Sequence, residues 1–489
     1  MNYCTPEQAG ISSARVIDFY KELDAYHLST HAVIMARGDK IFTEAYYAPF
    51  HAQFKHRMYS VSKNFVSVAI GFCEQDGLLS LDDPLCKFFS DYVAREGAIA
   101  HTLTLREMLK METAVEKGVS WFKSGTQDRT EVYFQNELQK NPGTLFNYDS
   151  SATYMLGVIV ERLTGKPFLE YLKDKVLREI GFSEDAYCIK APGGHSFGDS
   201  GVMCTARDLL LFARFVLNKG TFNGKRYLNE AYLTDALTMA VCNEDYGFSS
   251  HSSYGYGYQF WGAPRGCFGM FGMGNQIACC DPAHDFIFII NSDNQGNTHN
   301  YEQIFEALTR NILDHLDETK QVTDVASQLK LAEVERTRTL FSLPMARESA
   351  FSAKIDGVTF TCDENPMGIK WFRFDFAGKR GTFTYENAQG EKVMPFGFGY
   401  NEFAKFPEEG YADLVATIPA PGNYYDAAFS ADWPEAQKLR IRVQIIDKYF
   451  GNLAMVFGFC DEKTVSVRMT RKAEAFLHRY EGIANATAQ

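Results

Sequence analysis

The sequence predicts an α+β protein whose C-terminal part is an antiparallel β-domain. Helical periodicity alternates with short strand patterns up to about residue 318, and strand-like alternation dominates after Pro344. The 489 residues are 46% hydrophobic and 22% charged, which is typical of a globular protein with two or three domains. We therefore expect a mixed domain over residues 1–318, a linker with a short helix over 319–344, and an antiparallel β-barrel or sandwich over 345–489.

Local signals place the elements of the first domain. A Gly-Asp pair between two alternating apolar runs predicts a hairpin, and a glycine after each of three apolar periodic runs predicts where a helix ends. The predicted elements are, in order, a hairpin over 31–47, helices over 60–76, 150–164 and 205–219, a β-hairpin formed by 267–280 and 286–291 around Asp281-Pro282, and a helix over 301–317.

Charge and composition exclude several classes of protein. The net charge is -12, and a chain this acidic without a long basic run is not expected to bind nucleic acid or an anionic membrane. The N-terminus lacks the pattern of a signal peptide, and apolar stretches such as 286–290 are far too short to span a membrane. The eleven cysteines form no CxxC and no cluster with histidine, so we expect reduced thiols, no metal, no cofactor and a cytoplasmic location. The oligomeric state stays open, a homo-oligomer included.

The first candidate for chemistry is the pair Ser60 and Lys63. Positions i and i+3 share a helix face, and the helix that follows is apolar nearly all round, which predicts that it is buried. Ser60 falls in the first turn, where free backbone N–H groups and the positive end of the helix dipole stabilise a developing anion. Desolvation of Lys63 favours the neutral amine, which can accept a proton from the serine. A helix cap and a surface lysine are the alternative interpretation.

Two further segments contain candidates for proton transfer and for binding an oxyanion. Tyr148 precedes a predicted helix, with Ser150 two residues on. A tyrosine hydroxyl can act as a general base where cationic neighbours favour the phenolate, although a core aromatic residue and a helix cap would give the same pattern. Residues 267–276 hold three glycines in a strand, which indicates close approach of another backbone or a ligand and could supply an N–H to an oxyanion.

One motif competes with Ser60 for the role of nucleophile. Residues 194–198, Gly-His-Ser-Phe-Gly, match the G-x-S-x-G elbow with Ser196 at its centre. That elbow requires a buried strand before it and a helix directly after it, whereas here glycine-rich segments flank it on both sides. A loop near the site is the favoured interpretation of this segment.

These pieces, in this order, resemble the serine β-lactamase and D,D-peptidase superfamily. The similarity is to its class C β-lactamase-like group, which includes family VIII carboxylesterases, D-aminopeptidases and 6-aminohexanoate-dimer hydrolases. The resemblance covers about residues 5–317. It rests on Ser-Val-Ser-Lys at 60–63 together with the runs at 76–85, 103–111, 142–166 and 205–220.

The resemblance implies a fold and a set of roles. The fold would be a five-stranded antiparallel sheet flanked by helices with an all-helical subdomain, followed by a barrel-like (lipocalin-like) C-terminal domain. Ser60 would be acylated, Lys63 would activate it, and Tyr148 would share proton transfer. The backbone N–H groups of Ser60 and Met273 would form the oxyanion hole. Substrate would be bound by Ser150, Met270, Phe271 and Gly272.

Two departures from the family's motifs bear on the substrate. The Y-x-N motif is Tyr148-Asp149-Ser150 here, and the cationic first residue of the K-T-G strand motif is Met270. Losing a hydrogen bond from a cation to the substrate carboxylate costs about 1.5–3 kcal/mol. A neutral ester or amide with an apolar acyl part is therefore favoured over a β-lactam or C-terminal D-Ala substrate. The alternatives are a D-aminopeptidase-type amide hydrolase and a non-catalytic binding or sensor protein.

Overall fold

The computed structural model of the chain describes residues 1–489 except 93–98, 114–126, 136–140, 245, 247–252, 318–321, 346–347, 413–414, 416–417 and 474. The chain forms two compact units. The first comprises Met1–Asn294, His299–Thr339 and Leu414–Ile418, and the second comprises Gln295–Thr298, Leu340–Asp413 and Pro419–Gln489.

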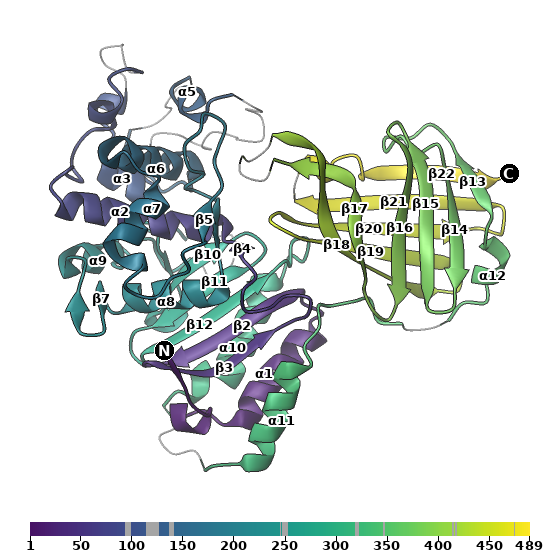
Figure 1. The fold of residues 1–489 in the computed structure, drawn as a ribbon, viewed down its shortest axis with the longest axis horizontal. Coiled ribbons are helices and arrows are strands. Elements are labelled where there is room, and N and C mark those ends of the chain that lie inside the picture. Colours follow the sequence, from purple (N-terminus) through teal and green to yellow (C-terminus); the bar gives the residue numbers. More distant parts are fainter. Residues whose placement is uncertain are drawn as a thin grey trace. The chain divides into compact units, whose positions relative to one another are not determined.

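The first unit is built on a seven-stranded sheet in the order β1-β3-β2-β12-β11-β10-β9 (Figure 1). Its five central strands are antiparallel, as predicted. Two strands of two residues each extend it, β1 in parallel with β3 and β9 antiparallel to β10. The strands are β1 (Asn2–Tyr3), β2 (Thr30–Arg37), β3 (Lys40–Tyr46), β9 (Trp261–Gly262), β10 (Phe268–Gly272), β11 (Gln276–Asp281) and β12 (Phe286–Ser292).

Helices cover both faces of this sheet (Figure 1). Helices α1, α10 and α11 pack together on one face, α8 packs on the other, and α2, α3, α6 and α7 pack on one another as a helical group. The helices of the unit are α1 (Ser13–Ala25), α2 (Ser62–Gln75), α3 (Leu105–Leu109), α5 (Arg129–Phe134), α6 (Ser150–Thr164), α7 (Phe168–Leu172), α8 (Ala206–Leu217), α9 (Glu230–Ala236), α10 (Asn300–Asn311) and α11 (Val325–Arg336). Short strands lie among them: β4 (His56–Arg57), β5 (Tyr187–Cys188), β6 (Val202–Cys204), β7 (Thr221–Phe222) and β8 (Lys225–Arg226).

One predicted strand is wrong. Residues 267–280 form not one arm of a hairpin but two strands, β10 and β11, joined by a turn. The turn is built by Asn275 and Gly274, whose φ angles of 70° and 80° lie in the left-handed region that glycine and asparagine tolerate. The glycines of this segment therefore serve two purposes, a turn and the close approach described below. The second hairpin, β11–β12 around Asp281-Pro282, is confirmed.

The segment that joins the two units along the chain contains α11, which is part of the first unit. Its Leu331 is 4% exposed and belongs to the core cluster between α1, α10 and the sheet. Burial of one leucine side chain contributes roughly 1.5–3 kcal/mol, so this contact helps to anchor α11 on the first unit.

The second unit is a closed antiparallel barrel, as predicted. Nine strands follow the order β16-β15-β14-β13-β22-β21-β20-β19-β18, and a parallel pairing of β16 with β18 closes the ring, with β17 added beside β18. Phenylalanines such as Phe372, Phe374, Phe383 and Phe457 contact one another and are buried. The elements are α12 (Ser352–Ile355), β13 (Thr359–Cys362), β14 (Trp371–Ala377), β15 (Arg380–Asn387), β16 (Gly390–Phe398), β17 (Glu402–Tyr411), β18 (Pro419–Glu435), β19 (Lys438–Ile446), β20 (Phe450–Phe459), β21 (Thr464–Ala473) and β22 (Gly482–Ala488).

A buried histidine pair makes the first unit sensitive to acid. His31 stacks on Phe50 with ring centroids 3.8 Å apart, and His56 lies 5.5 Å from His31. Burial lowers the pKa of His56 to about 3 and holds the pKa of His31 well below its usual value. Below pH 6.5 the unfolded chain takes up protons that the folded chain does not, so stability falls by about 1.4 kcal/mol per pH unit for each histidine.

We expect His56→Phe to weaken this acid sensitivity. Between pH 7.5 and 5.0 the variant should lose about 2 kcal/mol less stability than the wild type in urea unfolding, since His56 would titrate over about 1.5 units. His284→Gln is a control, because the contribution of His284 to stability changes with pH in the opposite direction. Hydrogen bonds to Asp281 and Asp317 raise the pKa of His284, so its contribution is present in acid and lost as the pH rises. An unchanged pH dependence in His56→Phe would contradict the assignment.

Candidate active site

The site is centred on a tight turn that leads into α2. Strand β4 ends at Arg57, a 3₁₀ turn covers Tyr59–Val61, and α2 begins at Ser62. Tyr59 has a φ of 46°, an uncommon backbone conformation for a bulky residue and one that marks functional turns. Ser60 itself is half-buried, whereas the helix after it is buried from Ser62 to Cys73. The turn thus presents one serine at the start of a buried helix.

Lys63 lies directly against the serine. Its Nζ is 3.1 Å from Ser60 Oγ and 2.7 Å from the carbonyl oxygen of Asp199, and both contacts are hydrogen bonds donated by the amine. The lysine side chain is 1% exposed. A lysine so buried is costly unless it is hydrogen-bonded, and here the two acceptors fix its nitrogen beside the serine hydroxyl.

Strand β10 meets the turn that holds Ser60 (residues 58–61) at Gly272. A Cβ placed on Gly272 would lie 2.3 Å from the carbonyl oxygen of Met58 and 3.3 Å from the backbone nitrogen of Ser60, so only glycine is accommodated. The next residue, Met273, is exposed and follows directly on the end of the strand. The hydroxyl of Tyr301 donates to the carbonyl oxygen of Gly272 at 3.2 Å and supports the strand end from α10. The end of β10 therefore lies against the turn that holds Ser60.

The other residues predicted on β10 do not all reach the serine. Met270 is completely buried, with Ala278 as its neighbour on β11. Phe271 alternates to the opposite face, where its ring lies 5.9 Å from Phe305 in the core under α10. The structure thus brings Ser60, Lys63 and Gly272 together and directs the Phe271 side chain away from them.

Tyr148 approaches Lys63 with its ring. The lysine Nζ is 5.1 Å from the ring centroid, within cation–π range, and Tyr148 is half-buried. In the described part of the chain, no hydrogen bond joins its hydroxyl to Ser60 or Lys63. Catalytic hydrogen bonds often form only when substrate is bound, so this geometry is compatible with proton transfer.

The two residues after Tyr148 form the start of α6. Asp149 is the buried N-cap, and its carboxylate accepts from the backbone N–H of Ser151 at 2.9 Å and from Thr113 Oγ1 at 2.9 Å. Burial raises the pKa of Asp149, and these hydrogen bonds oppose the shift. Ser150 is the first helical residue and is half-buried. Asp149 therefore supports the helix and positions Tyr148 and Ser150.

Aromatic side chains that sequence reasoning did not single out lie beside Tyr148. The ring of Trp261 is 5.3 Å and that of Tyr246 is 6.4 Å from the Tyr148 ring, and Phe146 contacts both. Trp261 is almost fully buried, whereas Tyr246 is 40% exposed. The sequence has four tyrosines between residues 246 and 258, but they are about 100 positions from residue 148, so the sequence alone did not predict that they meet Tyr148.

Ser196 has neither the strand nor the helix of a nucleophile elbow. It lies in the loop between β5 and β6 and is 4% exposed. Its backbone N–H donates to Glu161, which also bonds the His195 ring at 2.8 Å. The His195 imidazole is thus directed at a carboxylate, and no hydrogen bond between described residues places a base on the Ser196 hydroxyl.

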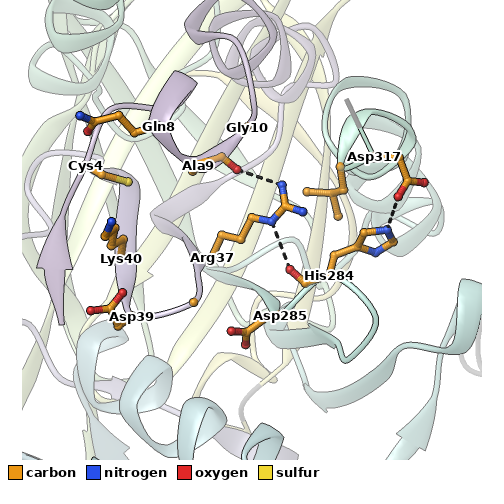
Figure 2. A pocket seen from close by; sticks show the side chains of 12 residues that line it. Cys4, Gln8, Ala9, Gly10, Arg37, Asp39, Lys40, His284, Asp285 and Asp317 are labelled. Atoms are coloured by element: carbon orange, nitrogen blue, oxygen red, sulfur yellow. Dashed lines mark hydrogen bonds and ion pairs between the residues drawn. The ribbon is translucent and has the colours of Figure 1, made fainter. Parts of the chain in front are cut away.

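A pocket of about 590 Å³ lies at the opposite end of β11 from the turn beside Ser60 (Figure 2). Figure 2 shows Arg37 between Ala9 and His284, whose carbonyl oxygens accept from its guanidinium at 3.0 Å and 3.2 Å. Cys4 also lines the pocket, but burial raises the pKa of its thiol and disfavours the reactive thiolate. Cys4 is therefore not expected to act as a nucleophile in this pocket.

Two searches of the described residues bear on other kinds of site. No group of three or more His, Cys, Asp and Glu side chains is arranged to hold a metal ion there. Nor is any helix in that part of the chain both long and apolar enough to cross a membrane.

The fold and the site define a mixed α+β protein with a serine and a lysine side by side at the start of a buried helix. Residues 16–309, more than half of the chain, match the model of the Beta-lactamase family. The chain belongs to that family, as the motifs indicated.

Three known proteins illustrate the similarity. The 6-aminohexanoate-dimer hydrolase of Paenarthrobacter ureafaciens is 26% identical over 283 residues, which cover 53% of this chain and 71% of that protein. A structure from Bacillus anthracis assigned as a 6-aminohexanoate-dimer hydrolase has a TM-score of 0.53 at 21% identity, covering 62% of this chain and 83% of that one. A structure from Bacteroides dorei assigned as a β-lactamase has a TM-score of 0.51 at 16% identity, covering 62% and 98%. At these identities the two structures establish the fold alone.

Proposed function

We propose that the chain is a serine hydrolase that cleaves a neutral amide or ester through an acyl-enzyme on Ser60. The observation that carries the proposal is the hydrogen bond of 3.1 Å between Lys63 Nζ and Ser60 Oγ at the start of a buried helix. A serine with a base in hydrogen-bond reach, and with that base oriented by a third group, is the general arrangement of an activated nucleophile.

The reaction follows from these positions. Lys63 takes the hydroxyl proton of Ser60 as Oγ bonds to the substrate carbonyl carbon. The backbone amides of Ser60 and Met273 would receive the negative charge on the carbonyl oxygen, an arrangement worth about 10²–10³ in kcat per donor in comparable sites. The proton then passes to the leaving amine or alcohol, with Tyr148 beside the lysine to share in this transfer. Water then attacks the acyl carbon and gives a proton to Lys63, the bond to Ser60 Oγ breaks as Oγ takes that proton back, and the carboxylic acid leaves.

The surroundings of Ser60 favour a neutral substrate with an apolar part. Strand β10 carries no cationic side chain, and its Met270 is buried. The ring of Tyr148 lies beside Lys63, and the exposed ring of Tyr246 lies beside Tyr148, so an apolar or aromatic group of the substrate can pack there. Ser150, at the start of α6, is the proposed hydrogen-bond partner for the substrate on the same side.

An amide is favoured over an ester as the bond cleaved. The curated relative named above acts, by its name, on a dimer of an amino acid, and an amide joins two such units. An ester of the same acyl group remains chemically easier to cleave, so activity on activated esters is expected as well.

Covalent labelling tests the proposal. A fluorophosphonate probe should modify Ser60, found by mass spectrometry of the peptide that contains it, and Ser60→Ala should lose both labelling and turnover. Ser196→Ala is the control and should label as the wild type does. If Ser60→Ala stays labelled and active, the assignment is wrong; if no acyl substrate gives a burst or turnover, the chain is a binding protein on this fold.

A panel of substrates separates the bond types. We expect turnover of neutral apolar p-nitroanilides and p-nitrophenyl esters, and a kcat/KM for a carboxylate-bearing β-lactam lower by roughly 10–100-fold, because the cation at position 270 is missing. Amides of D-amino acids with a free amine would report the peptidase alternative.

A further inference from the structure

The loop before β6 and the first residue of β6 form hydrogen bonds with the residues around the turn that holds Ser60. The carbonyl oxygen of Asp199 accepts from Lys63, that of Ser200 accepts from Arg57 Nε at 2.9 Å, and that of Val202 accepts from the backbone N–H of Met58 at 2.8 Å. The backbone carbonyls of residues 199 and 200 in the loop and of Val202 at the start of β6 therefore contact residues on both sides of Ser60. This loop follows the G-x-S-x-G match directly, and it gives that stretch of sequence a different role from the one its motif suggests.

Asp199 is the unusual member of the loop. Asp199 is 2% exposed, and its Oδ1 has no hydrogen-bond partner among the described residues. Buried carboxylates are rare unless they are paired with a charge or fully hydrogen-bonded, because desolvation of the anion is costly. Besides a hydrogen bond with its own backbone, the Asp199 carboxylate depends on the charges around it.

Those charges are three cations. Burial raises the pKa of Asp199, whereas the positive charges of Lys63, Arg129 and Arg57 act to lower it. The two arginines lie over the ring of Phe197, with the guanidinium carbon of Arg129 at 4.0 Å and that of Arg57 at 5.3 Å from its centroid. Arg129, on α5, is fully buried. One buried carboxylate thus lies among two buried guanidinium groups and the lysine that contacts Ser60.

One cysteine and two tyrosines also lie near Asp199 or Lys63. The charge of Asp199 contributes to the raised pKa of Cys188 on β5 and of Tyr154 on α6, although burial is the larger cause for both. Tyr148 presents its ring to Lys63 from the start of α6. The groups that face Asp199 or Lys63 are therefore Arg57 on β4, Ser60 before α2, Arg129 on α5, Tyr148 and Tyr154 at α6, and Cys188 on β5.

We propose that Asp199 is a positioning residue for Lys63: its carbonyl oxygen fixes Nζ beside Ser60, and its buried carboxylate offsets the two arginines so that the lysine can take the serine proton. The inference rests on the proposed function. When the proton moves from Ser60 Oγ to Nζ, a positive charge forms next to Arg57 and Arg129. A carboxylate in the same buried space stabilises that charge, since Coulomb interactions are strong where water is excluded.

Asp199→Asn tests the carboxylate alone, because it keeps the shape and the backbone carbonyl and removes the charge. We expect kcat to fall about 10–100-fold with KM changed less than about threefold, as for an interaction made in the transition state. We also expect the acidic limb of the kcat/KM profile to move to lower pH by about 0.5 unit or more, because uncompensated arginines disfavour the protonated lysine. Asp199→Glu, which keeps the charge, should return the limb to its wild-type position.

Asp208→Asn is the matched control. Asp208 is also 2% exposed, but it caps α8 through Thr205 and bonds Ser183. Its variant should lower Tm and leave the pH profile unchanged. If Asp199→Asn behaves as Asp208→Asn does, with a lowered Tm and an unmoved acidic limb, Asp199 is structural only and the proposal is overturned.

Labelling of Ser60 distinguishes a failure of the proposed function from a failure of the role assigned to Asp199. If wild-type Ser60 takes no label, the failure lies in the proposed function; if wild-type Ser60 is labelled and Asp199→Asn is labelled at the same rate, the failure lies in the role of Asp199. Should Asp199→Asn not fold, Arg129→Met removes one of the opposing cations, and its acidic limb should move to higher pH. An unmoved limb in Arg129→Met would overturn the proposal as well.

Discussion

Lys63→Met is expected to lower kcat/KM by roughly 10²–10⁴-fold while the fold is retained, because methionine fills a similar volume but cannot accept a proton. In the wild type the lysine Nζ has two fixed acceptors, Ser60 Oγ at 3.1 Å and the Asp199 carbonyl oxygen at 2.7 Å. Methionine would leave that carbonyl oxygen buried without its donor, at a cost in stability of about 1–3 kcal/mol. Steady-state kinetics on an activated ester, together with the thermal unfolding midpoint, measures both effects.

A second buried lysine supplies the control. Lys173 is 4% exposed, and its Nζ donates to Glu170 at 2.8 Å and to the carbonyl oxygens of Glu184 and Ala186. Lys173→Met should reduce stability by a comparable amount and leave the rate per folded molecule unchanged. Equal activity losses in the two variants would mean that Lys63 is structural, and the proposed mechanism would then lack its base.

Much of the fold was predictable because its signals are local. The hairpin of β2 and β3 follows from a Gly-Asp turn between apolar strands, and α6 ends where Gly165 adopts a φ of 69°. Strands of two residues, such as β1 and β9, carry no periodic pattern and could not be found this way. The split of 267–280 was missed because one short stretch uses its glycines for both a turn and a close contact.

The site was predictable only where side-chain identity carries the chemistry. Ser60 and Lys63 share a helix face at a fixed spacing, so the sequence alone brings them together. The Asp199 contact is made by a backbone carbonyl 136 positions away from Lys63, and a carbonyl has no sequence signature. Phe271 was predicted to bind substrate, but the alternation of a strand requires that Gly272 and Phe271 face opposite ways, and it is Gly272 that faces Ser60.

Gly272→Ala is expected to separate the strand from the turn that holds Ser60. The added methyl would lie 2.3 Å from the carbonyl oxygen of Met58, a distance that real Cβ atoms do not tolerate, and this backbone oxygen cannot rotate away. Relief of this overlap displaces β10 from Ser60, at a cost in stability of about 1–3 kcal/mol. Since displacement of reacting groups by about 1 Å costs on the order of 10²-fold in rate, kcat should fall at least that much.

Gly157→Ala is the matched comparison for this variant. Gly157 lies within α6, and a Cβ there would make ordinary contacts of 3.8 Å with Val66 and Gly198. Alanine in a helix interior is favoured over glycine by up to about 1 kcal/mol, so this variant should keep its activity and unfold no earlier than the wild type. Fluorophosphonate labelling of Ser60 distinguishes the causes of any loss. If the amides of Ser60 and Met273 act together, Gly272→Ala must label slowly even under conditions where it is fully folded. Wild-type labelling and turnover in folded Gly272→Ala would instead show that the close approach of β10 to the turn that holds Ser60 is not needed for catalysis.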